Sequence, residues 1–326
     1  MLRIWKASAV SLAAIVIVVS SMNWMGNARA NTTVPDSYVA VADQGSGGRI
    51  TLYDPLATDW NQSSAVKWSW YPNASNGFVD NQPGWGYPSG VKLRENCVYG
   101  GKWMVVVDSN GFAGIIPYPA GNSKKWSQVI PGNLHSIELL PDGNVAIAAS
   151  NGGWVRIYTS SQAVDSSTYV QYDLPGGHGV LWDPENELLW ALGNDHLVSL
   201  RITGTASAPV ITEVDKITLP TRWGHDLSPV YGDTDRLWVS SGSKVYQFTK
   251  STKIWSETYA GSSDANRAHV KAHGNQPSGQ IVRAVPKDGG VHPWTTDTVD
   301  FFLPNTSRTV TGGGFYKARI WNSDYQ

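Results

Sequence analysis

The chain has 326 residues, of which 41% are hydrophobic and 16% are charged, enough to bury a core in one large domain or two ordinary ones. Its 25 Lys and Arg residues nearly balance 26 Asp and Glu residues, so the net charge gives no general attraction to nucleic acid or to an anionic membrane. Any anion that the protein binds must therefore be recognised by a local group of side chains. We expect a monomer that binds no nucleic acid.

The N-terminal segment has the features of an export signal. Two basic residues precede a mostly apolar run, Ala9–Met22, and the Ala-Arg-Ala sequence at 28–30 fits the small-x-small cleavage pattern. We predict a signal peptide over residues 1–30, a secreted domain over residues 31–326, and no membrane association after cleavage. A membrane anchor is the alternative, but the apolar run is shorter than the ~20 residues of a spanning helix.

Similar segments recur along the rest of the chain. The segment Trp103–Phe112 is similar to Val145–Trp154, and Ser109 in the first aligns with Ser150 in the second at an offset of 41 residues. Leu188–Leu200 and Arg236–Phe248 repeat the same order of an apolar run, a turn of small residues and an alternating run. This pattern predicts hairpins of short β-strands.

The repeats predict an all-β fold, a single β-propeller. Each hairpin is preceded by a short stretch that opens on a basic residue and is followed by a fourth candidate strand, in units of 41 to 48 residues. Four short strands per unit, with turn residues between them, are typical of a propeller blade. We predict six blades, and a seventh only if the Gly-rich and Pro-rich segment Asn73–Gly90 contains strands.

The two chain ends are expected to share one blade. Candidate strands begin at Tyr38, Arg49 and Val66 without a first member, and Phe315–Trp321 has the sequence of a first strand. A blade made from both ends would close the ring and leave no open sheet edge.

Basic or imidazole side chains open the first strand predicted for each blade. Because first strands line the central channel, we expect these side chains to converge on one mouth. The set is Arg94, His135, His178, His225, His273 and Arg319. Cationic groups gathered there repel one another unless an anion compensates. Hydrogen bonding between blades is the alternative for any single histidine.

Two kinds of ligand suit such a ring. Imidazoles bind divalent metals, so a possible metal site for Mn²⁺, Zn²⁺ or Ca²⁺ is made of His135, His178, His225 and His273. A carboxylated sugar is the other ligand, because Arg offers a planar fork that matches a carboxylate. The residues predicted to bind such a substrate are Arg94, Arg319, Lys92, Lys317, His273 and Trp85, the last of these in a glycine-rich loop.

Four segments together resemble the secreted β-propeller polysaccharide lyases, such as ulvan lyases, rhamnose-glucuronate lyases and oligogalacturonate lyases. They are His135–Ser150, Gly177–Pro184, Trp223–Leu227 and Phe315–Trp321. The resemblance spans the mature chain, although these families usually have seven blades. It implies that the protein cleaves a uronic-acid polysaccharide by β-elimination, with an acidic polysaccharide or oligosaccharide as its partner.

The resemblance also implies roles for individual residues. Arg94 and Arg319, or a metal on the histidines, would neutralise the uronate carboxylate. A general base and a general acid would transfer the protons. The predicted catalytic residues are His135, His178, His225 and Tyr316, with His273 as a further candidate base or acid.

Two other functions are compatible with the sequence. One is a propeller that binds acidic glycans without cleaving them, which would release no unsaturated product. The other is a lactonase-like propeller hydrolase, but such enzymes are expected to hold calcium with Glu, Asn and Asp near the axis, where this sequence places His and Arg.

Overall fold

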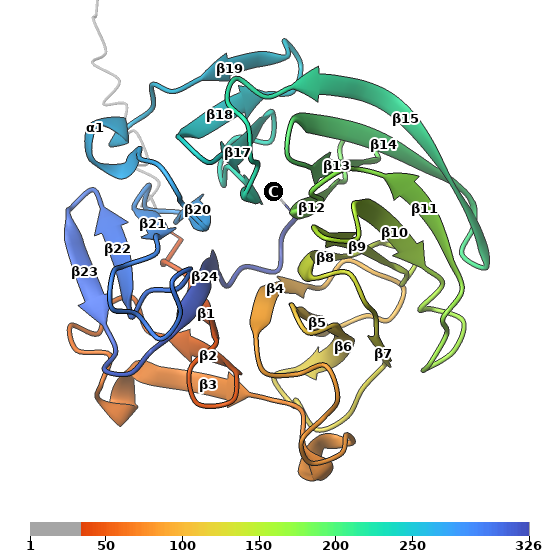
Figure 1. Ribbon diagram of the computed structural model, residues 1–326, viewed down its shortest axis with the longest axis horizontal. Coiled ribbons are helices and arrows are strands. Elements are labelled where there is room, and N and C mark those ends of the chain that lie inside the picture. The colour runs from red at the N-terminus through yellow and green to blue at the C-terminus, as the bar shows by residue number, and fades with distance from the viewer. Residues whose placement is uncertain (1–33, 326) are drawn as a thin grey trace, which may run out of the picture. The chain divides into compact units, whose positions relative to one another are not determined.

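Six four-stranded antiparallel sheets surround a central channel in the computed structural model, which describes residues 34–325 (Figure 1). The predicted fold class and the count of six blades are both confirmed. The predicted signal peptide, residues 1–30, lies outside the described residues. Within residues 34–325, no helix has the length and apolar character required to cross a bilayer.

One blade is built from both ends of the chain, as predicted. From the axis outward, its strands are β24 (Phe315–Ile320), β1 (Val39–Asp43), β2 (Arg49–Tyr53) and β3 (Val66–Trp70). Val39 pairs with Ile320 and Ala40 pairs with Arg319, so a strand from near the C-terminus closes the ring.

The other five blades follow one another along the chain, each with its first strand nearest the axis (Figure 1). The second and third blades contain β4 (Pro88–Arg94), β5 (Lys102–Asp108), β6 (Phe112–Tyr118), β7 (Trp126–Val129), β8 (Leu134–Leu139), β9 (Val145–Ala149), β10 (Trp154–Tyr158) and β11 (Tyr169–Asp173). The fourth contains β12 (Gly179–Asp183), β13 (Leu188–Leu192), β14 (His196–Thr205) and β15 (Ala208–Thr218). The fifth and sixth contain β16 (Asp226–Pro229), β17 (Arg236–Ser240), β18 (Val245–Thr249), β19 (Ile254–Ser256), β20 (Ala272–Asn275), β21 (Ile281–Ala284), β22 (Thr298–Phe302) and β23 (Thr306–Thr309).

Helical structure in the described residues is limited to three single turns. They are the 3₁₀ turns η1 (Ser63–Ala65) and η2 (Ala74–Asn76) and the helix α1 (Ser262–Ala265). The segment Asn73–Gly90 holds η2 and the start of β4 and adds no seventh blade.

The hydrophobic core lies between neighbouring blades, which explains the continuous apolar runs in the sequence. All five residues of β9 are buried. Ile147 packs into the cluster on one face of the sheet, while Ala146 and Ala148 pack into the cluster on the other face. Successive side chains of a strand point to opposite faces, so a strand between two other sheets must be apolar at every position.

Three of the first strands contain a β-bulge that shapes the channel. The bulged residues are Ser89 in β4, His135 in β8 and Tyr316 in β24, because pairing with the second strand skips each of them. A bulge leaves one residue unpaired and turns its side chain, often at a functional site.

Candidate functional site

A pocket of about 740 Å³ lies at the end of the channel where the first strands begin, and we call it the mouth pocket. Its functional side chains come from the start of five different blades. They are His135, His178, His225, Lys271 and Tyr316. Each is the second residue of a first strand or lies immediately before one. The predicted meeting of distant basic segments at one mouth therefore occurs, with Lys271 in place of His273 and Tyr316 in place of Arg319.

Tyr316 and His135 contact each other across the mouth. The Tyr316 hydroxyl lies 3.0 Å from His135 Nδ1, and both are the bulged residues of their strands. Burial raises the pKa of Tyr316, and the nearby Asp226 raises it further. The hydroxyl is therefore protonated at neutral pH and can pass a proton to or from the imidazole.

His178 is held in one tautomer beside His135. Its Nδ1 lies 2.7 Å from the carbonyl oxygen of Gly176, so Nδ1 carries the proton and Nε2 keeps its lone pair in the neutral ring. The two imidazole rings stack with centroids 4.2 Å apart. Burial lowers the pKa of His178 to about 4 and that of His135 well below its usual value, so both rings are neutral at pH 7.

Lys271 is the cation of the mouth pocket. Its Nζ lies 3.5 Å from Nε2 of His225, and no carboxylate of residues 34–325 forms an ion pair with it. Burial lowers the pKa of Lys271 to about 8 and, together with the Lys271 charge, lowers the pKa of His225 to about 2. None of the described residues that line the pocket is acidic.

The rim of the mouth pocket combines aromatic rings with amide side chains. The exposed fractions of Trp223 and Trp294 are 54% and 46%, and Tyr87 is partly exposed beside them. Three asparagines from turns between second and third strands also line the rim: Asn110, Asn151 and Asn194. Aromatic faces and amides are suited to the apolar faces and hydroxyls of sugars.

These rim residues were not predicted, although the sequence repeats contain a signal for two of them. Asn110 and Asn151 occupy the same position in the two hairpins that align at an offset of 41 residues. In a propeller, equivalent turns face the same end of the channel. The Trp223 and Trp294 positions show no comparable repeat.

A second depression adjoins the mouth pocket, and we call it the side groove. Its volume is about 760 Å³, and Lys271 and Trp294 line both spaces. Arg267 and His269 on its wall are exposed. An extended ligand held in the mouth pocket would therefore meet a further polar surface over the sixth blade, where Asp288 and Asp300 lie beside the basic residues.

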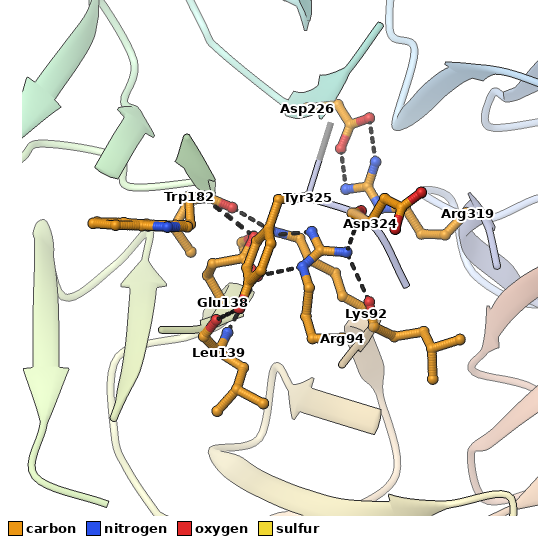
Figure 2. Close-up of polar contacts among 12 residues, drawn as sticks. Lys92, Arg94, Glu138, Leu139, Trp182, Asp226, Arg319, Asp324 and Tyr325 are labelled. Carbon is orange, nitrogen blue, oxygen red and sulfur yellow. Dashed lines mark hydrogen bonds and ion pairs between the residues drawn. The ribbon is translucent and has the colours of Figure 1, made fainter. Parts of the chain in front are cut away.

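The predicted positions of Arg94 and Lys92 at the mouth need correction. Arg94 forms a two-pronged ion pair with Glu138, with Nε to Oε1 at 2.7 Å and Nη2 to Oε2 at 3.0 Å, and Lys92 Nζ lies 2.8 Å from Oε2 (Figure 2). Leu93 pairs with Met104, whereas Leu139 pairs with Val145, so the connection after β4 is five residues longer than that after β8. The prediction that Arg94 opens its first strand, as His135 does, did not allow for this difference in loop length. Arg94 lies at the far end of its strand.

Arg319 and Lys317 also lie below the mouth. Lys317 Nζ is 2.9 Å from Asp226 Oδ1. Both Nη atoms of Arg319 bind the same carboxylate, with Nη1 to Oδ2 at 2.7 Å (Figure 2). Arg319 is three residues beyond Tyr316, which is about 10 Å along a strand. These two cations share the single carboxylate of Asp226 inside the channel and do not line the mouth pocket.

The far end of the channel is covered by the last described residues. The Tyr325 hydroxyl donates a hydrogen bond of 2.7 Å to the carbonyl oxygen of Leu139, and its ring lies under the guanidinium of Arg94. Arg94 Nη1 also reaches the carbonyl oxygen of Asp324 at 3.2 Å (Figure 2). A polymer therefore cannot be threaded through this channel without displacing the segment.

His273 and Trp85 lie outside the mouth pocket, contrary to expectation. The His273 ring is 1% exposed and packs against Trp238 and Tyr259, with centroid distances of 4.6 and 5.8 Å. Lys271, two residues earlier in the chain, lies in the mouth pocket where His273 was expected. Trp85 packs into the core and donates its indole N–H to the carbonyl oxygen of Gly48 at 3.1 Å.

The four histidines do not form the predicted metal site. His273 is separate from the other three, and the rings of His135 and His178 stack face to face, so their lone pairs do not converge. Over residues 34–325, no group of three or more His, Cys, Asp or Glu side chains is arranged to hold a metal ion.

Comparisons with known proteins identify a family and support the fold. The model of the family described as "Family of unknown function (DUF6528)" matches residues 6–287. No curated protein matches the chain. Among solved structures, the WD40 β-propeller domain of Doa1 is 12% identical with a TM-score of 0.50, covering 86% of this chain and 82% of that one.

Two further solved structures are similar at the level of fold. A functionally unknown protein from Desulfotomaculum acetoxidans DSM 771 is 11% identical with a TM-score of 0.50, covering 88% of this chain and all of that one. A virginiamycin B lyase from Staphylococcus aureus is 12% identical with a TM-score of 0.43, covering 69% and 70% of the two chains. The likeness to the Doa1 domain supports a β-propeller fold and carries no information about activity.

Proposed function

We propose that this chain, which belongs to the DUF6528 family, is a secreted carbohydrate-active protein whose mouth pocket binds a uronic acid residue of a polysaccharide. We further propose that it cleaves the chain there by β-elimination. The observation that carries the proposal is the Tyr316–His135 hydrogen bond beside Lys271, in a pocket whose described lining contains no acidic residue.

Lys271 supports the binding of a carboxylate. Its ammonium group is partly buried and forms no ion pair within the described residues, so a sugar carboxylate would supply the missing counter-ion. Charge-assisted hydrogen bonds of this kind are stronger than neutral ones. The exposed rings of Trp223 and Trp294 provide surfaces for sugar rings, and the side groove has room for neighbouring sugars.

The same side chains can perform the two proton transfers of the reaction. A base removes the proton at C5, the C4–O bond breaks, a C4=C5 double bond forms, and an acid protonates the departing oxygen. Nε2 of His178 has a lone pair to accept the C5 proton. The Tyr316 hydroxyl can donate to the departing oxygen, with His135 as its proton partner. Lys271 would stabilise the negative charge that develops on the carboxylate.

One observation favours a second candidate function, binding without cleavage. Burial lowers the pKa of His178 to about 4 and that of His225 to about 2, and a general base works best when its pKa is near the working pH. A bound carboxylate would raise these values. If it does not raise them enough, the pocket would hold an acidic glycan and leave it intact.

The lactonase-like alternative has less support. Calcium coordination by Glu, Asn and Asp, and hydrolysis by paired carboxylates, both require acidic side chains. The described lining of the mouth pocket supplies only asparagines of these types. Glu138 and Asp226 lie deeper and already bind two cationic side chains each.

The test is to incubate the purified protein with a panel of uronate-containing polysaccharides, with and without chelator. Ultraviolet absorbance of the new double bond measures cleavage, and calorimetry with the same polymers measures binding. We expect both signals, with chelator having no effect. Heat of binding without absorbance would select the binding function. Neither signal with any polymer would contradict the proposal.

A further inference from the structure

Six ionisable side chains are buried together in the channel beneath the mouth pocket, and we call them the channel charges. They are Lys92, Arg94, Lys317, Arg319, Glu138 and Asp226. None is more than 8% exposed. Four cations face two carboxylates, so the group has two excess positive charges when all six are ionised. Buried charge without a partner is costly, so a group of this kind requires compensation.

Both carboxylates remain ionised at neutral pH, so the excess is no larger than two charges. Burial alone would raise the pKa of Glu138, but Arg94 and Lys92 hold it below its usual value. Arg319 and Lys317 likewise hold the pKa of Asp226 far below its usual value. The two carboxylates therefore supply their full negative charge at neutral pH, and the excess remains.

A small cavity of about 30 Å³ lies among the channel charges. Its polar lining includes Lys92, Arg94, Arg319, Ser228 and Tyr231, and none of the described residues around it is acidic. The cavity shares no lining residue with the mouth pocket. Its volume is sufficient for a water-sized guest.

Arg319 lines this cavity, and one of its hydrogen-bond donors has no acceptor among the described residues. Both of its Nη atoms bind Asp226, whereas its buried Nε has no hydrogen-bond partner within residues 34–325. The corresponding Nε of Arg94 donates to Glu138 at 2.7 Å. A buried cationic donor without an acceptor is rare in folded proteins.

We propose that the cavity binds a small inorganic anion of the size of chloride between Lys92, Arg94 and Arg319. The anion accepts a hydrogen bond from Nε of Arg319 and offsets one of the two excess charges. A water molecule could accept the same hydrogen bond but would leave the charge excess unchanged. The anion binds cationic side chains from β4 and β24, which are the first strands of two blades, and so stabilises the closed ring.

Deprotonation of a buried lysine would also reduce the excess positive charge, and so competes with anion binding. Burial lowers the pKa of Lys92 to about 7, against the opposing effect of Glu138, and lowers that of Lys317 to about 8. Lys92 also faces Arg94 and Arg319, while Lys317 faces Arg319, Lys271 and Asp226. An anion in the cavity would keep Lys92 protonated, so binding is expected to strengthen as pH falls from 9 to 6.

Thermal unfolding of the purified full chain tests the proposal. The melting temperature is measured in sodium chloride and in sodium gluconate at the same ionic strength, because gluconate is too large for the cavity. We expect a saturable rise in chloride alone, about 2–4 °C for each tenfold increase above the dissociation constant, and a larger rise at pH 6 than at pH 9. Identical melting temperatures in the two salts at pH 6 would overturn the proposal.

A pair of variants locates the effect. Lys92→Met removes one of the three cations around the cavity and leaves Glu138 paired with Arg94, so the variant should need a higher chloride concentration for the same response. Lys244→Met removes an exposed lysine that is paired with Glu257, and should keep the full response. A Lys92→Met protein that responds to chloride like the unmodified chain contradicts the assignment.

Crystals of the unmodified protein grown in bromide provide a test that does not depend on the folding of a variant. We expect an anomalous scattering peak in the cavity beside Nε of Arg319. Density for water at that position, without an anomalous peak, would overturn the proposal.

Discussion

The hydroxyl of Tyr316 lies 3.0 Å from Nδ1 of His135, although 181 residues separate the two in the chain. The contact depends on two bulges, one in the last strand of the chain and one in the first strand of the third blade. The blade between them carries only the small side chain of Ser89 at the equivalent bulge, which leaves Tyr316 room to reach across. The closed ring thus creates a hydrogen-bonded Tyr–His pair that neither segment contains alone.

Substitution of Tyr316 by Phe tests this pair. The change keeps the ring but removes the hydroxyl, so we expect cleavage of a uronate polymer to fall ~10²–10⁴-fold. Binding of the same polymer should change only a few-fold, because the carboxylate contact with Lys271 remains. Initial rates from double-bond absorbance, compared with calorimetric binding, separate the two effects.

The matched control is Tyr259→Phe. The Tyr259 hydroxyl is buried and has no hydrogen-bond partner in the described part of the chain, and it lies outside the mouth pocket. This variant should cleave at the normal rate. Normal cleavage by Tyr316→Phe as well would exclude Tyr316 as the acid.

Substitution of Lys271 by Met tests carboxylate recognition. Loss of one charged hydrogen bond, worth about 1.5–3 kcal/mol, should weaken binding of a uronate oligosaccharide ~10–100-fold. A methyl-esterified form of the same sugar should bind both proteins about equally, because it carries no charge for Lys271 to recognise. Lys244→Met is the control, because Lys244 is an exposed lysine that pairs with Glu257 and lines neither the mouth pocket nor the side groove. Equal losses in the two variants would argue against a specific role for Lys271.

The fold was predictable from sequence because a propeller repeats one local pattern. The hairpin that contains Ser109 and the hairpin that contains Ser150 align at 41 residues, and each forms an antiparallel pair of second and third strands, with a difference of one residue between the two registers. Apolar residues at every position of the inner strands follow from burial between two sheets. The closure of the ring also followed from the sequence, since the first blade lacked one strand and the C-terminal segment supplied it.

The site was only partly predictable, because loop length and bulges set which side chain reaches the mouth. Three histidines lie there as expected, but the five extra residues after β4 place Arg94 at the opposite end of its strand. Lys271, not His273, immediately precedes β20. The pairing of Glu138 with Arg94 and Lys92 joins two blades and depends on distances that a single sequence does not provide.

The alkaline limit of glycan binding should follow the protonation of Lys271. Burial lowers its pKa to about 8, so the ammonium is charged below this pH and neutral above it. We expect affinity for a uronate oligosaccharide to fall as pH rises from 7 to 9. A bound carboxylate favours the charged form of Lys271. The pH at which half of the affinity is lost should therefore lie above the pKa of Lys271 in the free protein. Lys271→Arg should keep its affinity at pH 9, because an arginine stays protonated there. The same decline in Lys271→Arg would assign the limit to another group.

Replacement of Glu138 by Gln tests whether the channel charges stabilise the ring. The neutral amide leaves Lys92 and Arg94 buried without their carboxylate, so the free energy of unfolding from denaturant titration should fall by about 3–5 kcal/mol at pH 7. Glu257→Gln changes an exposed carboxylate that pairs with Lys244, and should leave the free energy of unfolding unchanged. The pKa of Glu138 is below its usual value in the folded protein, so its contribution is complete above pH ~4.3 and is lost as pH falls further. Stability of the unmodified protein should therefore decline below that pH more steeply than stability of Glu138→Gln. Parallel declines would mean that other carboxylates govern unfolding in acid.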